Sequence, residues 1–384
     1  MIYLDHNATT PPAPAAVEAM LAVMTDVWAN ASSQHSVGQQ AKRALAAARA
    51  TIAAALGCKP KELIFTSGAT EANHLAVLGL SAQAAGRPRL VFGAVEHAAH
   101  LKLARSLAAQ GHPVDFIAVR ADGTLDLDDA ARVIGPDVAL VSVMAANNET
   151  GVLMPVAELR ALAHAAGARL HVDATQFVGK QPFDFSALGA DAVSLSAHKL
   201  RGPKGIGALI VRDGVPIAAQ FLGSQERHRR GGTENLPAIA GFAAALDRLP
   251  DAAVEAARVG ALRDALEEGL RRALPDVHVY GASAPRLAGT SYLRIGRLEA
   301  ETVLQRCEQI GVSASSGSAC SSGGSEPSHV LTAMGVAPDE ALCAVRFSLG
   351  ADTTARDVDY LLAALPPLLL PLLAESAESA EPTM

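Results

Sequence analysis

The sequence contains few cysteines, and none of them are spaced as a metal site or a redox motif would require. Cys58, Cys307, Cys320 and Cys343 are scattered, without a C-x-x-C pair. Neither a disulfide framework nor a zinc site is therefore expected, and the compartment is expected to be reducing. The first residues also lack the charged and apolar regions of a signal peptide, so we expect the cytoplasm.

Clustered positive charge and long apolar runs are also missing. The net charge is −7 and no block of lysines and arginines occurs, so neither nucleic acid nor a membrane surface is an expected partner. A small anionic or zwitterionic substrate fits this charge better. The most apolar stretch, 361–374, is interrupted by prolines and is shorter than the ~20 residues of a membrane span. It predicts a final packed helix that breaks at the prolines.

What the sequence does contain is a regular alternation of short β-branched runs with Ala- and Leu-rich helical stretches, from residue 16 to 250. This alternation predicts an α/β fold with a mainly parallel sheet wrapped by helices, and the remainder predicts a smaller α+β domain. Ligands of such sheets bind on the loops beyond the strand ends. Polar segments follow the predicted strands at 67–70, 96–97, 147–149, 173–176 and 196–199.

A lysine and a carboxylate lie at two of these strand ends. Lys199 follows Ser196 and His198 and precedes a loop rich in glycine and proline. Such a lysine can have the lowered pKa that covalent bonding to a carbonyl requires, although a solvated loop lysine is the common alternative. Asp173 ends a predicted strand, where a carboxylate is costly unless it is paired. A protonated pyridine nitrogen would be one partner, and a structural ion pair would be another.

The segment 67–71 follows a strand and opens a helix. Its backbone N–H groups and hydroxyls could bind a phosphate, because a helix N-terminus carries free donors and a positive dipole end. Taken alone, the segment is better explained by an ordinary helix cap.

Cys320 differs from the other three cysteines in its surroundings. It lies in the segment 315–325, which consists of small polar residues with almost nothing apolar to bury a thiol. Most free cysteines are inert core residues, and Cys58, Cys307 and Cys343 fit that description. We therefore predict that Cys320 is the accessible, reactive thiol of the chain.

Taken in order, these motifs resemble the NifS/IscS-type cysteine desulfurases, which belong to the class V aminotransferase family of fold-type I pyridoxal-phosphate enzymes. The matching segments are 3–5, 7–10, 32–38, 66–71, 96–97, 147–151, 173–179, 196–207, 230–233, 315–320 and 346–350. The resemblance implies a large domain, 16–250, with a mainly parallel seven-stranded sheet. Residues 1–15 and 251–374 would form a smaller α+β domain that carries the Cys320 segment, and 375–384 would be a disordered tail.

The resemblance also implies pyridoxal 5'-phosphate as the cofactor. Lys199 would hold it covalently, Asp173 would pair with its pyridine nitrogen, and Gln176 and Asn148 would bond near the ring hydroxyl. His97 would stack on the ring and move protons. The phosphate would be bound by Ala69, Thr70, Ser196, His198 and, from a second subunit, Thr233.

For the substrate, the resemblance implies L-cysteine, with Arg346 binding its carboxylate and Asn148 nearby. A homodimer would convert it to L-alanine, and Cys320 would receive the sulfur as a persulfide. No resident metal is implied, although Cys320 could contact an iron–sulfur cluster during transfer. The sulfur would pass to an acceptor protein, a scaffold or carrier that the sequence does not identify, for iron–sulfur clusters, thio-cofactors or tRNA thiolation.

Three alternatives remain. A selenocysteine lyase or another class V aminotransferase would share Lys199 and Asp173, and a non-enzymatic adaptor could keep the fold alone. Cys320 argues against an aminotransferase, which has no use for a thiol at that position. The joint presence of Lys199, Asp173, His97, Cys320 and Arg346 argues against an adaptor. A preference for selenium stays open.

Overall fold

The computed structural model describes residues 1–84, 86–317 and 326–378. Its largest sheet has seven strands in the order β2-β8-β7-β6-β5-β3-β4. The strands are β2 (Leu63–Thr66), β3 (Arg89–Gly93), β4 (Val114–Ile117), β5 (Val138–Met144), β6 (Arg169–Asp173), β7 (Ala192–Ser196) and β8 (Gly207–Val211). Only β8 runs antiparallel to its neighbours β2 and β7, so the predicted mainly parallel seven-stranded sheet is confirmed.

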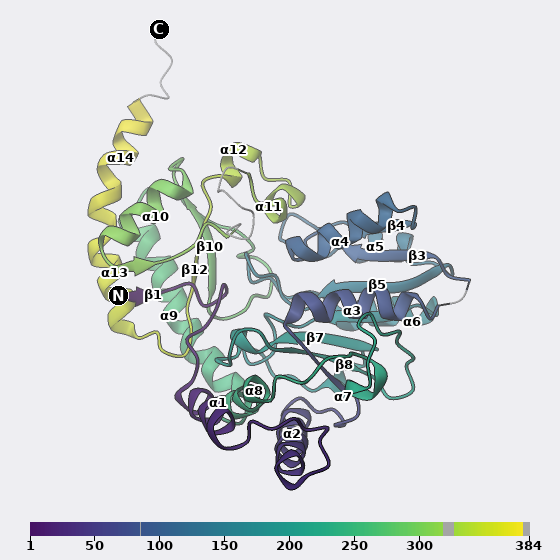
Figure 1. Cartoon of the computed structure of the whole chain (residues 1–384). Helices are drawn as coiled ribbons and strands as arrows, with labels where there is room; N and C mark the ends of the chain where they lie inside the picture. Colours follow the sequence, from purple (N-terminus) through teal and green to yellow (C-terminus); the bar gives the residue numbers. More distant parts are fainter. Residues whose placement is uncertain (85, 318–325, 379–384) are drawn as a thin grey trace.

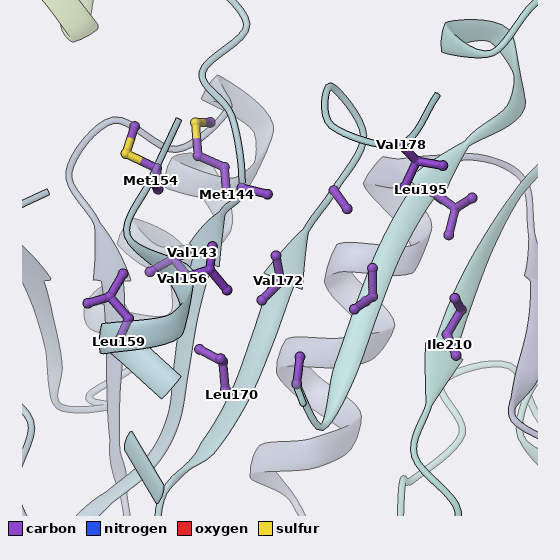
Figure 2. Close-up of a cluster of buried hydrophobic side chains, with 14 of the residues drawn as sticks. Val143, Met144, Met154, Val156, Leu159, Leu170, Val172, Val178, Leu195 and Ile210 are labelled. Carbon is purple, nitrogen blue, oxygen red and sulfur yellow. The ribbon is translucent and has the colours of Figure 1, made fainter. Parts of the chain in front are cut away.

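Successive residues of the central strands are buried in opposite cores. In β8, Ile210 joins the core on one face, whereas Leu209 and Val211 join the core on the other. The strand sequences therefore read as continuous apolar runs, as expected when helices cover both faces of a parallel sheet. Figure 2 shows one of these cores, with Leu195 and Ile210 from adjacent strands.

Helices separate the strands along the chain and cover the two faces (Figure 1). Among those that contribute to the core in Figure 2 are α2 (Ser36–Ala55), α5 (Leu127–Val133), α6 (Val156–Ala165), α7 (Phe185–Leu188) and α8 (Leu236–Asp247). The opposite core contains residues of α3 (Ala69–Ser81) and α4 (Ala98–Ala109). Helix α1 (Pro14–Asp26) packs on α8, and short 3₁₀ turns at Ala197–Lys199 and Gln225–His228 complete this part of the chain.

A second core surrounds a three-stranded antiparallel sheet of order β12-β10-β9. Its strands are β9 (Val277–Val279), β10 (Thr290–Ile295) and β12 (Val345–Ser348), and its helices are α9 (Ala252–Ala273), α10 (Ala300–Gln309), α13 (Ala355–Ala364) and α14 (Pro366–Glu378). Two further short helices, α11 (His329–Ala333) and α12 (Pro338–Ala341), contribute residues to the core in Figure 2 instead. Strand β1 (Ile2–Tyr3) pairs in parallel with β11 (Val312–Ser313), which brings the N-terminal segment to this core. The domain boundaries given above stay a prediction.

The C-terminal helices continue through the prolines more than the sequence predicted. The helical conformation is interrupted only at Leu365, between α13 and α14. Pro371 lies inside α14, so the predicted break of the helix at this proline is wrong. Pro366 opens α14, where the missing N–H is no loss. The leucines Leu361, Leu365, Leu369 and Leu373 recur every fourth residue and are buried in the second core, which holds the helices in place.

Helix α14 extends to Glu378, into the segment predicted as a tail. Within the described part of the chain, the stretch Ala355–Glu375 is the one helical run long and apolar enough to cross a membrane. Its buried leucines also fit a helix that packs on a protein core.

Candidate active site

A cavity of about 650 Å³ lies beyond the carboxyl ends of the central parallel strands. It collects most of the residues that the sequence predicted for the site. Lining it are Ala69, Thr70, His97, Asn148, Asp173, Gln176, Ser196, His198, Lys199 and Arg346. Segments far apart in the sequence therefore meet at one edge of the sheet, as the strand-end argument anticipated.

Two predicted residues are not among those lining this cavity. Thr233 lies in a neighbouring cavity of about 240 Å³, beside Glu226 and Arg230. Ser67 and Gly205 line both cavities, so the two are adjacent. Cys320 lies outside the described residues. Gly317, which precedes that gap, lines the larger cavity.

Asp173 is a buried carboxylate at the end of β6. Burial alone would raise its pKa, but hydrogen bonds outweigh this effect and its pKa is lowered. Asn73 Nδ2 donates to its Oδ2 at 2.6 Å, and the Thr175 backbone N–H donates to its Oδ1 at 2.9 Å. Asp173 is therefore negatively charged at neutral pH. Because it lines the cavity, it can bind a cationic group of a ligand there.

Lys199 ends the short turn that follows β7 and points its amine toward the segment 5–10. Its Nζ donates to the backbone oxygens of Asn7, at 2.5 Å, and Ala8, at 2.6 Å. Two carbonyls from the N-terminal segment thus position the amine at the cavity wall, just beyond the end of β7, the strand next to the one that ends in Asp173.

The two histidines of the cavity are held in their neutral forms. Burial lowers the pKa of His97, and the charge of Asp173 only partly opposes this. His97 Nδ1 accepts from the Ala99 N–H at 3.3 Å and caps α4, so the ring proton lies on Nε2. Burial and the cations Lys199 and Lys204 lower the pKa of His198 to about 4.

The N-terminus of α3 presents uncapped donors to the cavity. Gly68 is the N-cap residue and makes no side-chain hydrogen bond, so the ordinary cap considered for this segment is absent here. The loop that contains Gly68 packs closely against β8: a Cβ atom added at Gly207 would lie only 2.7 Å from the Gly68 Cα. Thr70, Ser196 and His198 line the same cavity. Such an arrangement suits a phosphate group.

Arg346 enters the cavity from β12 of the second sheet. Its guanidinium donates to Asp5 Oδ1 at 2.7 Å and to the Asn148 backbone oxygen at 2.9 Å. Within the described ranges its buried Nε–H has no hydrogen-bond partner. Nη1 and Nη2 each keep one further N–H, so the guanidinium is suited to a ligand carboxylate. On the same strand, the backbone of Arg346 pairs with Ser315, at the start of the Cys320 segment.

Several residues of this site were not assigned a role from the sequence. Asn73 supports Asp173, Asp5 supports Arg346, and Asn7 and Lys180 bond to Gln176. Asn73 could have been noticed as a polar residue on the otherwise apolar face of α3. Asp5 and Asn7 lie in the motif segments 3–5 and 7–10, but their partners Arg346 and Gln176 are remote in the sequence, so no role could be assigned to them. Lys180 gave no local signal.

These residues fit pyridoxal phosphate at three points. The charged Asp173 carboxylate suits a pyridinium nitrogen, the Lys199 amine suits an aldehyde, and the start of α3 suits a phosphate. All three groups face one cavity that is large enough for such a ring and a small amino acid.

Comparison with known proteins gives a consistent picture. The family model for class-V aminotransferases matches residues 2–361. A cysteine desulfurase from Gluconacetobacter diazotrophicus is 44% identical over 97% of this chain and 94% of its own. A cysteine desulfurase IscS from Anaeromyxobacter dehalogenans is 44% identical over 94% of this chain and 90% of its own.

Solved structures agree in fold. A NifS-like protein superposes with a TM-score of 0.89 at 32% identity, covering 96% of this chain and 99% of that one. SspA in complex with cysteine superposes with a TM-score of 0.81 at 31% identity, covering 91% of this chain and 99% of that one.

Proposed function

This chain belongs to the class-V aminotransferase family and is a cysteine desulfurase, and from this premise we propose which of its residues carry the reaction. The substrate is L-cysteine and the products are L-alanine and a sulfur atom bound to Cys320. The observation that carries the proposal is the meeting of Asp173, Lys199 and Arg346 at one cavity, from two different sheets.

Pyridoxal 5'-phosphate is the proposed cofactor, and it supplies an electron sink for charge that develops at the substrate Cα. Asp173 holds the pyridine nitrogen protonated, because a buried carboxylate that stays charged stabilises a neighbouring cation. Ala69, Thr70, Ser196 and His198 bind the phosphate. The Lys199 amine would hold the cofactor through its aldehyde carbon.

Arg346 and Asn148 orient the substrate. The guanidinium binds the substrate carboxylate with its free N–H groups, while its bond to Asp5 keeps the plane fixed. The Lys199 amine would also accept the proton from the substrate Cα. His97, whose ring proton is on Nε2, would exchange protons with the substrate.

The sulfur step requires a nucleophile, and we assign it to Cys320. Its thiolate attacks the substrate sulfur, a new S–S bond forms and the Cβ–S bond breaks. The electron pair of that bond stays with the carbon skeleton, which takes up protons to become alanine. Support comes from Gly317 and Ser315, which bring the start of the Cys320 segment to the cavity and to Arg346.

The remaining parts of the proposal concern assembly and destination. Two copies form a dimer in which Thr233 binds the phosphate of the neighbouring site, which fits its position in an adjoining cavity. The sulfur leaves Cys320 for an acceptor protein of iron–sulfur, thio-cofactor or tRNA-thiolation chemistry. The proposed location is the cytoplasm, where the thiols of Cys58, Cys307 and Cys343 stay unpaired.

Replacement of Cys320 by alanine tests the central claim. The variant should still bind the cofactor and change its visible absorbance with L-cysteine, because ring chemistry needs no thiol. Alanine release should fall to near background, whereas Cys58→Ala should be close to neutral. Mass spectrometry of briefly treated wild-type enzyme should find the added sulfur on the Cys320 peptide. Alanine release at the wild-type rate from Cys320→Ala would replace this mechanism by a lyase or aminotransferase reaction.

A further inference from the structure

Lys180 is a charged residue close to the active site to which the mechanism above assigns no role. It lies seven residues after Asp173, the last residue of β6, and its side chain is partly buried. Its Nζ donates to Gln176 Oε1 at 2.6 Å and to Asn7 Oδ1 at 2.7 Å. Burial lowers the pKa of Lys180 well below its ordinary value, and the cations Lys199 and Arg346 lower it further. An ammonium group at this position is stabilised by the hydrogen bonds that it donates to the two amide oxygens.

Lys180 does not line the cavity that contains Asp173 and Gln176. It lines a separate, mostly apolar cavity of about 90 Å³, together with Leu200 and Leu249. Asn7 and Lys199 line both cavities and so form the wall between them. Lys180 therefore lies behind this wall and would not touch the cofactor.

The chemistry of the ammonium group determines which way the neighbouring amides point. The Lys180 amine donates to both amides beside it, so each of them presents its oxygen to Lys180. The Gln176 oxygen faces Lys180, and its Nε2 consequently faces the opposite way. One Nε2 hydrogen goes to the Asn7 backbone oxygen at 2.8 Å. The second remains for the cofactor cavity, which Gln176 lines.

The orientation of the Asn7 side-chain amide is determined in the same way, and Asn7 links the two sheets. With its side-chain oxygen facing Lys180, its Nδ2 donates to the Asn148 backbone oxygen at 3.1 Å and to Thr290 Oγ1 at 3.0 Å. Its backbone N–H donates to Ser348 Oγ at 2.9 Å. An amide turned the other way would lose its bonds to Asn148 and Thr290 and would place an NH₂ group against an ammonium. The orientation is therefore strongly determined.

We propose that Lys180 is a positioning residue for cofactor binding, which holds the side-chain oxygens of Asn7 and Gln176 and thereby turns the Gln176 amide nitrogen toward an oxygen of the bound cofactor ring. The inference rests on the proposed role of Gln176 in binding near the ring hydroxyl. A donor at this point matches the ring oxygen of pyridoxal phosphate, which accepts hydrogen bonds. An inverted amide would present an oxygen to that acceptor and repel it.

The test measures binding without covalent chemistry. The probe is 4-deoxypyridoxine 5'-phosphate, which keeps the ring hydroxyl and the phosphate but lacks the aldehyde that reacts with Lys199. Its Kd is measured by calorimetry on full-length enzyme freed of cofactor. Lys180→Met keeps the length of the side chain but removes its donors, and it should weaken binding about tenfold, as the loss of one well-placed hydrogen bond does. Lys180→Arg, which still has only donors, should restore most of the affinity.

A double-mutant cycle separates a positioning role from a general electrostatic one. In a Gln176→Ala background, Lys180→Met should change the Kd by less than about twofold, because the group through which Lys180 acts is gone. Lys102→Met is the matched control. It removes a lysine charge from the exposed side of α4 and should leave the Kd within about twofold of the wild-type value.

Three outcomes would overturn the inference: an unchanged Kd in Lys180→Met, the same loss in both backgrounds, or an equal loss in Lys102→Met. If Lys180→Met does not fold, Lys180→Gln replaces it. The carboxamide of this variant both donates and accepts, so the Gln176 amide can take either orientation. Wild-type affinity in Lys180→Gln would therefore also contradict the inference. Failure of the proposed function looks different, because wild-type enzyme itself would then not bind the probe or pyridoxal 5'-phosphate.

Discussion

Replacing Arg346 by lysine should raise the KM for L-cysteine strongly. In the structure the guanidinium is almost fully buried, with a side-chain exposure of 4%, and it already donates to Asp5 and to the Asn148 backbone oxygen. Nη1 and Nη2 each keep one further N–H for the substrate, and the buried Nε–H has no partner within the described ranges. A lysine ammonium can keep the bond to Asp5 but lacks the fork that reaches a carboxylate with two parallel bonds.

The magnitude follows from the number of bonds lost. One charge-assisted hydrogen bond contributes about 1.5–3 kcal/mol, so losing it should raise KM by roughly 10- to 150-fold. The assay measures alanine formed from L-cysteine over a range of concentrations. Cysteamine provides the comparison, since it has the thiol and the amine but no carboxylate. Its binding, followed by the visible absorbance of the enzyme, should be nearly unchanged by Arg346→Lys.

Asp5→Asn serves as the structural control for this prediction. It weakens the support of the guanidinium but leaves the guanidinium in place, so KM should rise less than in Arg346→Lys. An unchanged KM in Arg346→Lys would refute the reasoning and place the carboxylate elsewhere. An equal loss for cysteine and cysteamine would also refute it, because that result would reflect a collapsed site.

Three further predictions concern the other groups. Lys199→Ala should abolish turnover and the visible absorbance band while leaving the thermal unfolding temperature close to that of wild type; a yellow, active variant would contradict the cofactor assignment. Thr233→Ala should weaken cofactor retention, and mixed dimers with Lys199→Ala should regain one intact site; full activity in a monomer would contradict the dimer. Burial lowers the pKa of His6 to about 4, so the unfolded chain takes up a proton that the folded chain refuses. The free energy of unfolding should therefore fall as the pH drops from about 6.5 to 4, by at most about 1.4 kcal/mol per pH unit for this residue, and urea titrations of His6→Gln should show a smaller slope.

The sheet and most of the cavity could be predicted from the sequence for physical reasons. Strands buried on both faces are short apolar runs, and a polar residue placed directly after such a run, such as Asp173, must lie at the strand end. Parallel strands then bring their ends together without further information. The same rule accounts for His97 and Lys199.

Other features depend on contacts that no local pattern reveals. The orientation of Gln176 depends on Lys180 and on Asn7, which is 169 residues away in the sequence. Helix α14 tolerates Pro371 because its leucines are buried in the second core, and tertiary packing of this kind overrides local propensity. Thr233 lies outside the main cavity, which follows from the path of a long loop.

The segment 5–10 has a consequence for the order in which the enzyme matures during synthesis. Asn7 contacts Ser348 across 341 residues of chain, and Asp5 contacts Arg346 across 341 residues as well. The central sheet can assemble while the ribosome is still translating, since domains tend to fold as they emerge. The carbonyls that position Lys199 and the support that orients Arg346 are brought together only after β12 has left the exit tunnel. A nascent chain should therefore form its central sheet before it can retain its cofactor, and translation products stalled before β12 should contain this sheet but be colourless.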